Sequence, residues 1–156
     1  MHAALGTIPS PASKPMAQAL TDQQLLFSGT ASHRGRHTSV SPGNSSLRHL
    51  CYGRILLDSS VPHVSFETGA RETALLCMRG GCSVEVDGTP HTLGLYDAIY
   101  VPRGSSLEVT SDAEVDLVEC AAEVDGDYPL QVVPYQQVQQ NPAQKFTAGG
   151  FCCTCW

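Results

Sequence analysis

From Cys51 to Ala121 the sequence consists of short runs of β-branched or aromatic residues, each closed by a cluster of turn residues. Such runs are typical of β-strands. They predict strands at residues 52–57, 61–67, 72–78, 82–86, 89–93, 98–101, 106–110 and 115–121. Strands about ten residues apart with no helical segment between them favour an antiparallel barrel or sandwich and exclude a doubly wound α/β fold. We therefore expect an all-β fold.

Turn residues and alternation support this interpretation. Asp87-Gly88 separates two alternating runs, which is the strongest short-range hairpin signal, and Gly80-Gly81 and Pro102-Arg103-Gly104 mark further corners. Apolar and polar residues alternate along the strands, as expected when one face of each strand is buried. We predict that Val84, Val86, Leu107 and Val109 line the interior, that Tyr96 and Tyr100 are barrel aromatics, and that the acids of residues 114–120 mostly face water.

Charge is distributed unevenly along the chain. The 156 residues carry a net charge of -6, but residues 1–57 hold five basic side chains and one acid, whereas the remainder holds four and fourteen. An acidic main body argues against nucleic acid as a partner. Hydrophobic residues make up 42% of the chain and charged residues 15%, which excludes a disordered protein and suits one folded domain.

Nothing in the sequence predicts a membrane segment or a secretory signal. The longest apolar runs, such as Ala74–Met78, fall far short of the roughly 20 residues that a spanning helix needs. The N-terminus lacks a basic region followed by an apolar one, so we expect a cytoplasmic protein. Seven cysteines without paired spacing are interpreted as free thiols, at positions 51, 77, 82, 120, 152, 153 and 155.

The first 46 residues, rich in Ser, Pro, Gly, Thr and Ala, are predicted to form an extended, partly disordered arm with at most a short helical turn at 17–26. The barrel is assigned to 47–140, and a linker and atypical tail to 141–156. Within the arm, His33-Arg34-Gly35-Arg36-His37 is interpreted as a solvated loop; a contact point for RNA or phosphate is the alternative. Gly35 argues against a helix that would bring the two histidines together, so a metal role there is not favoured.

Three segments carry a resemblance to a known family: residues 67–76 (ETGARETALL), 80–88 (GGCSVEVDG) and 93–105 (LGLYDAIYVPRGS). Together they look like a cupin, a jelly-roll barrel, and they resemble the KduI/IolB family of uronate isomerases. Residues 146–150 also resemble the link between the two cupin halves of that family. The resemblance therefore covers roughly residues 45–150 and implies the N-terminal half.

The resemblance implies a ketol-isomerase that acts on a deoxygenated uronic acid, either 5-deoxy-glucuronate in inositol breakdown or 4-deoxy-5-keto-uronate in pectin breakdown. Such chemistry moves a proton between neighbouring carbons, so it needs a base and an electrophile that is commonly a metal ion. A basic residue would bind the substrate carboxylate. The implied partner is a small-molecule sugar acid.

The metal ligands are where this sequence departs from a working cupin. The first motif of a metal-binding cupin carries His-x-His and then Glu, and a second-motif His completes the set. Here His63-Val64-Ser65 lacks the second imidazole, Glu72 remains, and Leu107 occupies the place of the closing His. We expect no metal in this chain, since a transition metal needs about three or four protein ligands. The resemblance implies zinc or another divalent metal in the second cupin half of the full-length family.

The end of the chain also departs from the family. The last six residues do not resemble the family's continuation, and we expect a truncation or a frameshift. Cys152, Cys153 and Cys155 would be incidental in that case; a soft-metal site or a redox switch is the alternative.

Weak catalytic candidates are Glu72, Arg103 and His91. Glu72 is either a base inside the barrel or, as favoured, an ion-pair partner of Arg71, Arg79 or Arg103. Arg103 either grips a carboxylate or is a solvent-facing turn residue, and His91 either reaches a pocket or is simply packed on its strand.

Two functions are carried forward from the sequence. The first is a ketol-isomerase half that is inactive alone, and the alternative is a non-catalytic cupin domain that binds a small acid. A metal-dependent oxygenase lacks the required histidines. Unpaired strand edges and an apolar face lead us to expect a homo-oligomer.

Overall fold

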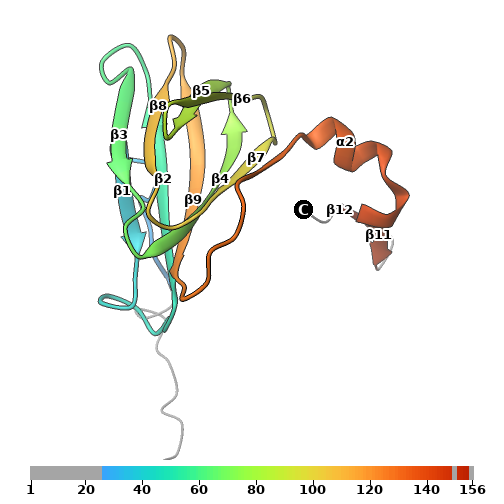
Figure 1. The fold of residues 1–156 in the computed structure, drawn as a ribbon, viewed down its shortest axis with the longest axis horizontal. Coiled ribbons are helices and arrows are strands. Elements are labelled where there is room, and N and C mark those ends of the chain that lie inside the picture. Colours follow the sequence, from blue (N-terminus) through green and yellow to red (C-terminus); the bar gives the residue numbers. More distant parts are fainter. Residues whose placement is uncertain (1–25, 149–150, 155–156) are drawn as a thin grey trace, which may run out of the picture.

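A computed structural model describes residues 26–148 and 151–154 (Figure 1). Its first nine strands are β1 (Gly35–Val40), β2 (Leu50–Leu57), β3 (His63–Glu67), β4 (Arg71–Arg79), β5 (Cys82–Val86), β6 (Thr89–Leu93), β7 (Ala98–Val101), β8 (Ser106–Thr110) and β9 (Val115–Glu123). After these come β10 (Gln131–Val133), helix α2 (Tyr135–Gln140), the 3-10 helix η1 (Pro142–Gln144), β11 (Lys145–Ala148) and β12 (Phe151–Thr154). The all-β prediction is confirmed.

Two antiparallel sheets form the body of the molecule. One has the order β1-β2-β9-β4-β7-β10, and the other has the order β3-β8-β5-β6. Non-consecutive neighbours in both sheets are the result of the crossing connections of a jelly roll. The β11-β12 hairpin follows α2 and η1 and forms a two-stranded sheet of its own (Figure 1).

Alternate residues of each strand build the core between the sheets. The largest fully buried side chains on the six-stranded sheet include Ile55, Leu57, Leu75, Ile99 and Leu117. From the other sheet Val84, Val86, Leu107 and Val109 meet them, all at most 3% exposed. The prediction that these four line the interior is confirmed.

Tight turns occur where the turn residues predicted them. Asp87 (φ 50°) and Gly88 (φ 79°) form the two-residue loop of the β5-β6 hairpin. The Asp87 carboxylate accepts a hydrogen bond of 2.8 Å from the backbone N–H of Ser106, which fastens this hairpin to β8. Gly80 (φ 78°) turns the chain between β4 and β5 against the backbone of Glu114.

Strand β1 is the main addition to the predicted elements. Residues 35–40 were assigned to the extended arm, but they pair with β2 in the six-stranded sheet. The segment has little hydrophobic alternation. Its long-range anchors are Arg36, bound to Glu119 of β9, and the preceding Arg34, bound to Asp58 just after β2. Of the helical turn predicted at 17–26, residues 17–25 lie outside the described residues.

Four cysteines, Cys51, Cys77, Cys82 and Cys120, are free thiols, as predicted. Burial, followed by the nearby Cys77 thiol, raises the pKa of Cys82 to about 12. The side chains of the other three predicted thiols, at 152, 153 and 155, lie outside the described part of the chain. Within the described residues, no helix is long and apolar enough to cross a membrane.

Candidate functional site

An ion pair lies inside one end of the sandwich. Glu119 is on the inner face of β9, with its side chain only 3% exposed. Arg36 of β1 donates two hydrogen bonds to it, from Nε at 2.8 Å and from Nη2 at 2.7 Å. The Arg36 guanidinium also lies 3.9 Å from the ring centroid of Phe66 on β3, so the pair connects the two sheets.

This pair corrects two expectations. The acids of residues 114–120 were predicted mostly to face water, but Glu119 is buried and Asp116 is half-buried against Arg54. The basic run at 33–37 was interpreted as a solvated loop, but Arg34 and Arg36 both bind acids of the sandwich. A carboxylate on an inner face is tolerated here because two hydrogen bonds from Arg36 replace its lost hydration, while the Phe66 ring contacts the guanidinium.

The inner face at this end does not suit a divalent metal, which the family resemblance implies for the second cupin half. Within the described ranges, no group of three or more His, Cys, Asp or Glu side chains is arranged to hold a metal ion. Both Glu119 oxygens are occupied by a guanidinium, whose positive charge repels a metal cation. His63 is exposed on the outer side of β3, and Leu107 is part of the core.

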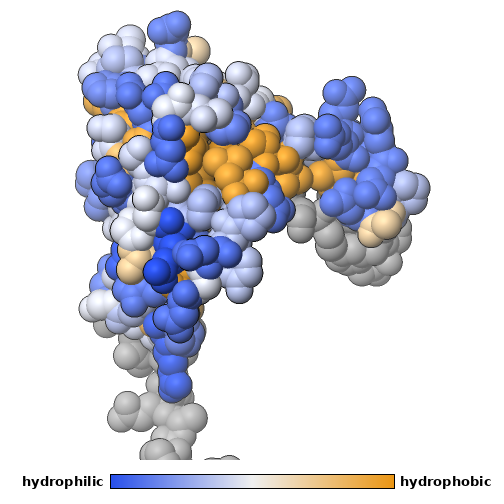
Figure 2. Space-filling view, in the orientation of Figure 1, coloured by the Kyte–Doolittle hydropathy of each residue, from blue (hydrophilic) through white to orange (hydrophobic). Residues whose placement is uncertain are grey.

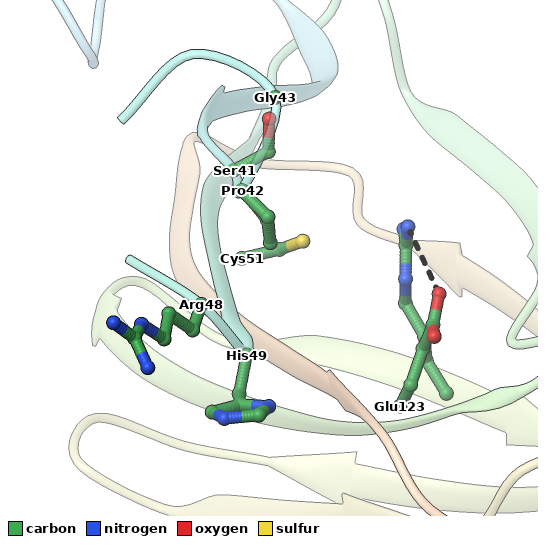
Figure 3. A pocket seen from close by; sticks show the side chains of 8 residues that line it. Ser41, Pro42, Gly43, Arg48, His49, Cys51 and Glu123 are labelled. Carbon is green, nitrogen blue, oxygen red and sulfur yellow. Dashed lines mark ion pairs between the residues drawn. The ribbon is translucent and has the colours of Figure 1, made fainter. Parts of the chain in front are cut away.

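A cavity of about 280 Å³ opens at the same end (Figure 3). Its wall combines a loop with the ends of three strands of the six-stranded sheet. The lining residues are Ser41, Pro42, Gly43, Arg48, His49, Cys51, Arg71 and Glu123. Cys51 begins the inner face of β2, Arg71 begins β4, and Glu123 ends β9.

The charges of this cavity are only loosely compensated. Arg71 and Glu123 form an ion pair at 4.0 Å, with side chains 46% and 75% exposed (Figure 3). Arg48 is exposed and has no hydrogen bond or ion pair with any described residue, and His49 beside it is exposed as well. The cavity is therefore a basic site on an acidic protein.

The loop above the cavity is held by its own hydrogen bonds. Asn44 accepts a bond of 2.7 Å from the backbone N–H of Ser41, and its Nδ2 donates to the Ser39 carbonyl at 3.0 Å. Ser45 Oγ donates to the Ser41 carbonyl at 2.7 Å. This Asx-type turn fixes the rim without using the basic residues.

Beneath the cavity, the inner face continues to the Arg36–Glu119 pair. A smaller hollow there shares Cys51 and Arg71 with the cavity and is also lined by Arg36 and Glu119. Arg71 thus borders both spaces. Arg36, Arg48, Arg71 and Glu119 were not predicted as site residues. The basic excess of residues 1–57 pointed toward Arg36 and Arg48 alone.

Glu72 does not lie inside the barrel. It is on the outer face of β4, where its carboxylate accepts a hydrogen bond of 2.9 Å from Tyr100 Oη. Burial and then this bond raise the pKa of Tyr100 to about 12. The favoured structural role of Glu72 thus has Tyr100 as partner instead of an arginine. Tyr96 is likewise outside, 39% exposed and edge-on to Tyr135, so neither tyrosine lines the interior.

Arg103 is bound by the chain itself. Its Nη1 donates to the Val124 carbonyl at 2.8 Å, and its Nε lies 3.1 Å from Asp127. It is a turn residue that fastens the segment after β9. His91 is half-buried on the edge strand β6, paired in register with Val84, and makes no hydrogen bond to any described residue. Glu72 and Arg103 border the segment 124–128, and His91 lies on the other sheet.

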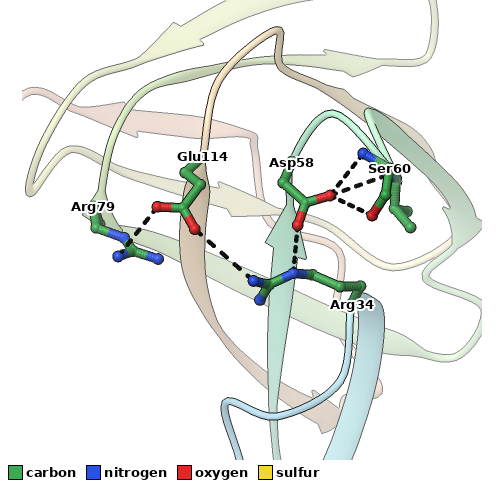
Figure 4. A network of polar contacts seen from close by, with 6 residues as sticks. Arg34, Asp58, Ser60, Arg79 and Glu114 are labelled. Carbon is green, nitrogen blue, oxygen red and sulfur yellow. Dashed lines mark hydrogen bonds and ion pairs between the residues drawn. The ribbon is translucent and has the colours of Figure 1, made fainter.

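A second polar network lies at the opposite end of the six-stranded sheet (Figure 4). Asp58 accepts hydrogen bonds from the backbone N–H and Oγ of Ser60 and from Arg34 Nε. Glu114 lies between Arg34, at 3.8 Å, and Arg79, at 3.4 Å. These contacts join the start of β1 to the end of β2.

Solved structures identify the fold. A cupin protein from Bacteroides fragilis aligns with a TM-score of 0.50 at 10% identity, over 75% of this chain and 92% of that one. The two-sheet jelly roll accordingly has the fold of a cupin. Within that class, the model of the KduI/IolB family matches residues 25–144, so the chain belongs to this family.

Two longer proteins have the same fold. An IolB-like protein from Salmonella typhimurium LT2 aligns with a TM-score of 0.60 at 19% identity over 68% of this chain, and a putative glyoxylate-induced protein from Pseudomonas aeruginosa with 0.53 at 14% over 73%. The chain covers 44% and 49% of their lengths. A comparison with curated proteins finds no match.

Proposed function

We propose that this chain serves the aldose–ketose isomerisation of a deoxy-uronic acid, as a domain that binds the sugar acid and does not contain the reaction centre. Membership of the KduI/IolB family supports the reaction class. The chain covers less than half of the IolB-like protein, and the proposal assigns the reaction centre to the part that it does not cover. Either 5-deoxy-glucuronate or 4-deoxy-5-keto-uronate fits this proposal.

The Arg36–Glu119 pair is the observation that carries the non-catalytic part of the proposal. An isomerase needs a base that can take a proton from carbon. Glu119 is the carboxylate buried within the sandwich, but both of its oxygens accept hydrogen bonds from Arg36. Glu72 faces the outer surface and is bonded to Tyr100. Neither carboxylate lines the cavity at the end of the sandwich, and Glu123, which does line it, is paired with Arg71.

The alternative, a non-catalytic small-ligand-binding cupin with no link to isomerisation, would use the same basic cavity. No contact in the described residues favours it over the family function. The two differ in ligand range, since a family domain should prefer uronic acids.

An isomerase assay tests the proposal. The purified chain is mixed at stoichiometric concentration with each deoxy-uronate, with and without added zinc or manganese, and the aldose and ketose forms are followed by NMR. We expect both sugar signals to keep their ratio. Metal-dependent interconversion that exceeds the rate without protein would contradict the proposal, and loss of that turnover in Glu123→Gln would identify the base.

A further inference from the structure

The loop that contains Arg48 and His49 covers the cavity at the end of the sandwich, where Arg71 also lies. From these residues we propose that the cavity is a binding site for the carboxylate of a single sugar acid. The inference deepens the proposed function, on which it rests for the choice of a uronic acid.

The charge of the cavity lining favours an anionic ligand. Two guanidinium groups, of Arg48 and Arg71, and one carboxylate, of Glu123, line the cavity, so these three side chains carry one net positive charge. The chain as a whole carries -6. A local positive site on an acidic protein attracts anions to that place. One net charge matches a monocarboxylate better than a doubly charged phosphate.

The guanidinium N–H donors of Arg48 and Arg71 are available to a ligand. Arginine binds a carboxylate through two parallel N–H bonds, which no other side chain does as well. Arg48 has no partner among the described residues, and its guanidinium extends away from the Arg71–Glu123 pair in Figure 3. Arg71 is held only by a 4.0 Å contact with a side chain that is 75% exposed. A ligand carboxylate can therefore replace Glu123 at little cost.

The size and the fixed rim of the cavity suit a small ligand. A volume of about 280 Å³ is at the small end of ligand pockets and suits one monosaccharide. The rim is fixed by the Ser41–Asn44 turn, which lowers the entropy cost of binding. The floor is Cys51, below which Glu119 is neutralised by Arg36 and does not repel an anion.

The test is titration calorimetry of the full chain with D-glucuronate, which carries the carboxylate, and with D-glucose, which lacks it. We expect saturable binding of glucuronate that weakens as sodium chloride is added, and no binding of glucose. Inorganic phosphate serves as a third probe. Equal binding of glucose, tighter binding of phosphate, or no binding of glucuronate would overturn the assignment.

Variants locate the site. Arg48→Gln and Arg71→Gln should each weaken glucuronate binding about tenfold or more, the effect of losing one charged hydrogen-bond donor. The matched control Arg79→Gln removes an arginine of the same strand at its other end and should bind as the parent does. Glu123→Gln removes the competing carboxylate and should strengthen binding, which an unfolded variant could not do.

The failures of the two proposals are distinguishable. If both cavity variants bind glucuronate as the parent does, the cavity assignment is wrong while the family function stands. If the parent chain isomerises a deoxy-uronate, the proposed function is wrong, and the variants then still report whether this cavity holds the carboxylate.

Discussion

At the scale of single residues, the Arg36–Glu119 pair joins β1 to the inner face of β9. Removal of one partner of a buried pair leaves the other uncompensated. We expect Glu119→Ala to lower the free energy of unfolding by about 2 kcal/mol, less than the 3–5 kcal/mol of a fully buried pair, since Arg36 is 32% exposed. Urea unfolding measures the effect.

The double variant Arg36→Met, Glu119→Leu is the control for this experiment. It removes both charges and keeps most of the volume, so it should be close to the parent in stability. A double variant less stable than Glu119→Ala would show that the pair contributes more than charge compensation.

Asp58 provides a prediction for acid stability. The Ser60 hydroxyl, and then its N–H, stabilise the ionised carboxylate, and the pKa of Asp58 is lowered to about 2. A group with a lowered pKa stabilises the fold above its unfolded pKa, near 3.9, and this contribution is lost as the pH falls through the folded value. Asp58→Asn should therefore destabilise at pH 7 and show less pH dependence of unfolding between about 4 and 2. A parent and variant that differ equally at pH 7 and pH 2 would refute this.

At the scale of elements, the turn between β4 and β5 should not tolerate a side chain. A Cβ on Gly80 would lie 2.2 Å from the Glu114 carbonyl oxygen, in addition to the cost of φ 78°. We expect Gly80→Ala to destabilise by about 3 kcal/mol or more, because backbone must move. Gly88→Ala, at φ 79° with no atom within 4 Å of the new Cβ, is the control and should cost about 1 kcal/mol. Equal thermal shifts in the two variants would contradict the packing argument.

The strands between residues 52 and 121 were predictable because turn residues and alternation are local properties of the sequence. Leu107 and Val109, for example, are separated by Glu108 and both face the core. Strand β1 was not predictable in this way, since its arginines are anchored to Asp58 and Glu119, 24 and 83 residues away. The same reason hid the candidate site, because Arg48, just before β2, and Arg71, at the start of β4, line one cavity only once β2 and β4 lie in the same sheet.

At the scale of the whole molecule, a groove of about 640 Å³ runs along the outer face of the six-stranded sheet. Ala74, Ile99, Val124, Tyr128 and Val133 line it in part, and Figure 2 shows apolar surface beside the C-terminal segment. Such a face supports self-association. We expect light scattering after size exclusion to give a mass above that of one chain, and Ala74→Lys, which places a charge in the groove, to lower it. A monomeric parent chain would contradict this expectation.

The central claim is that this cupin domain binds a uronic acid and does not convert it. Saturation-transfer NMR of 5-deoxy-glucuronate with the purified chain and added zinc, without manganese, tests the binding and the lack of conversion in one sample. The account predicts transfer of saturation to the sugar protons, loss of that transfer in the double variant Arg48→Gln, Arg71→Gln, and an unchanged ratio of aldose to ketose. Ketose that accumulates with time, or transfer that persists undiminished in the double variant, would contradict it.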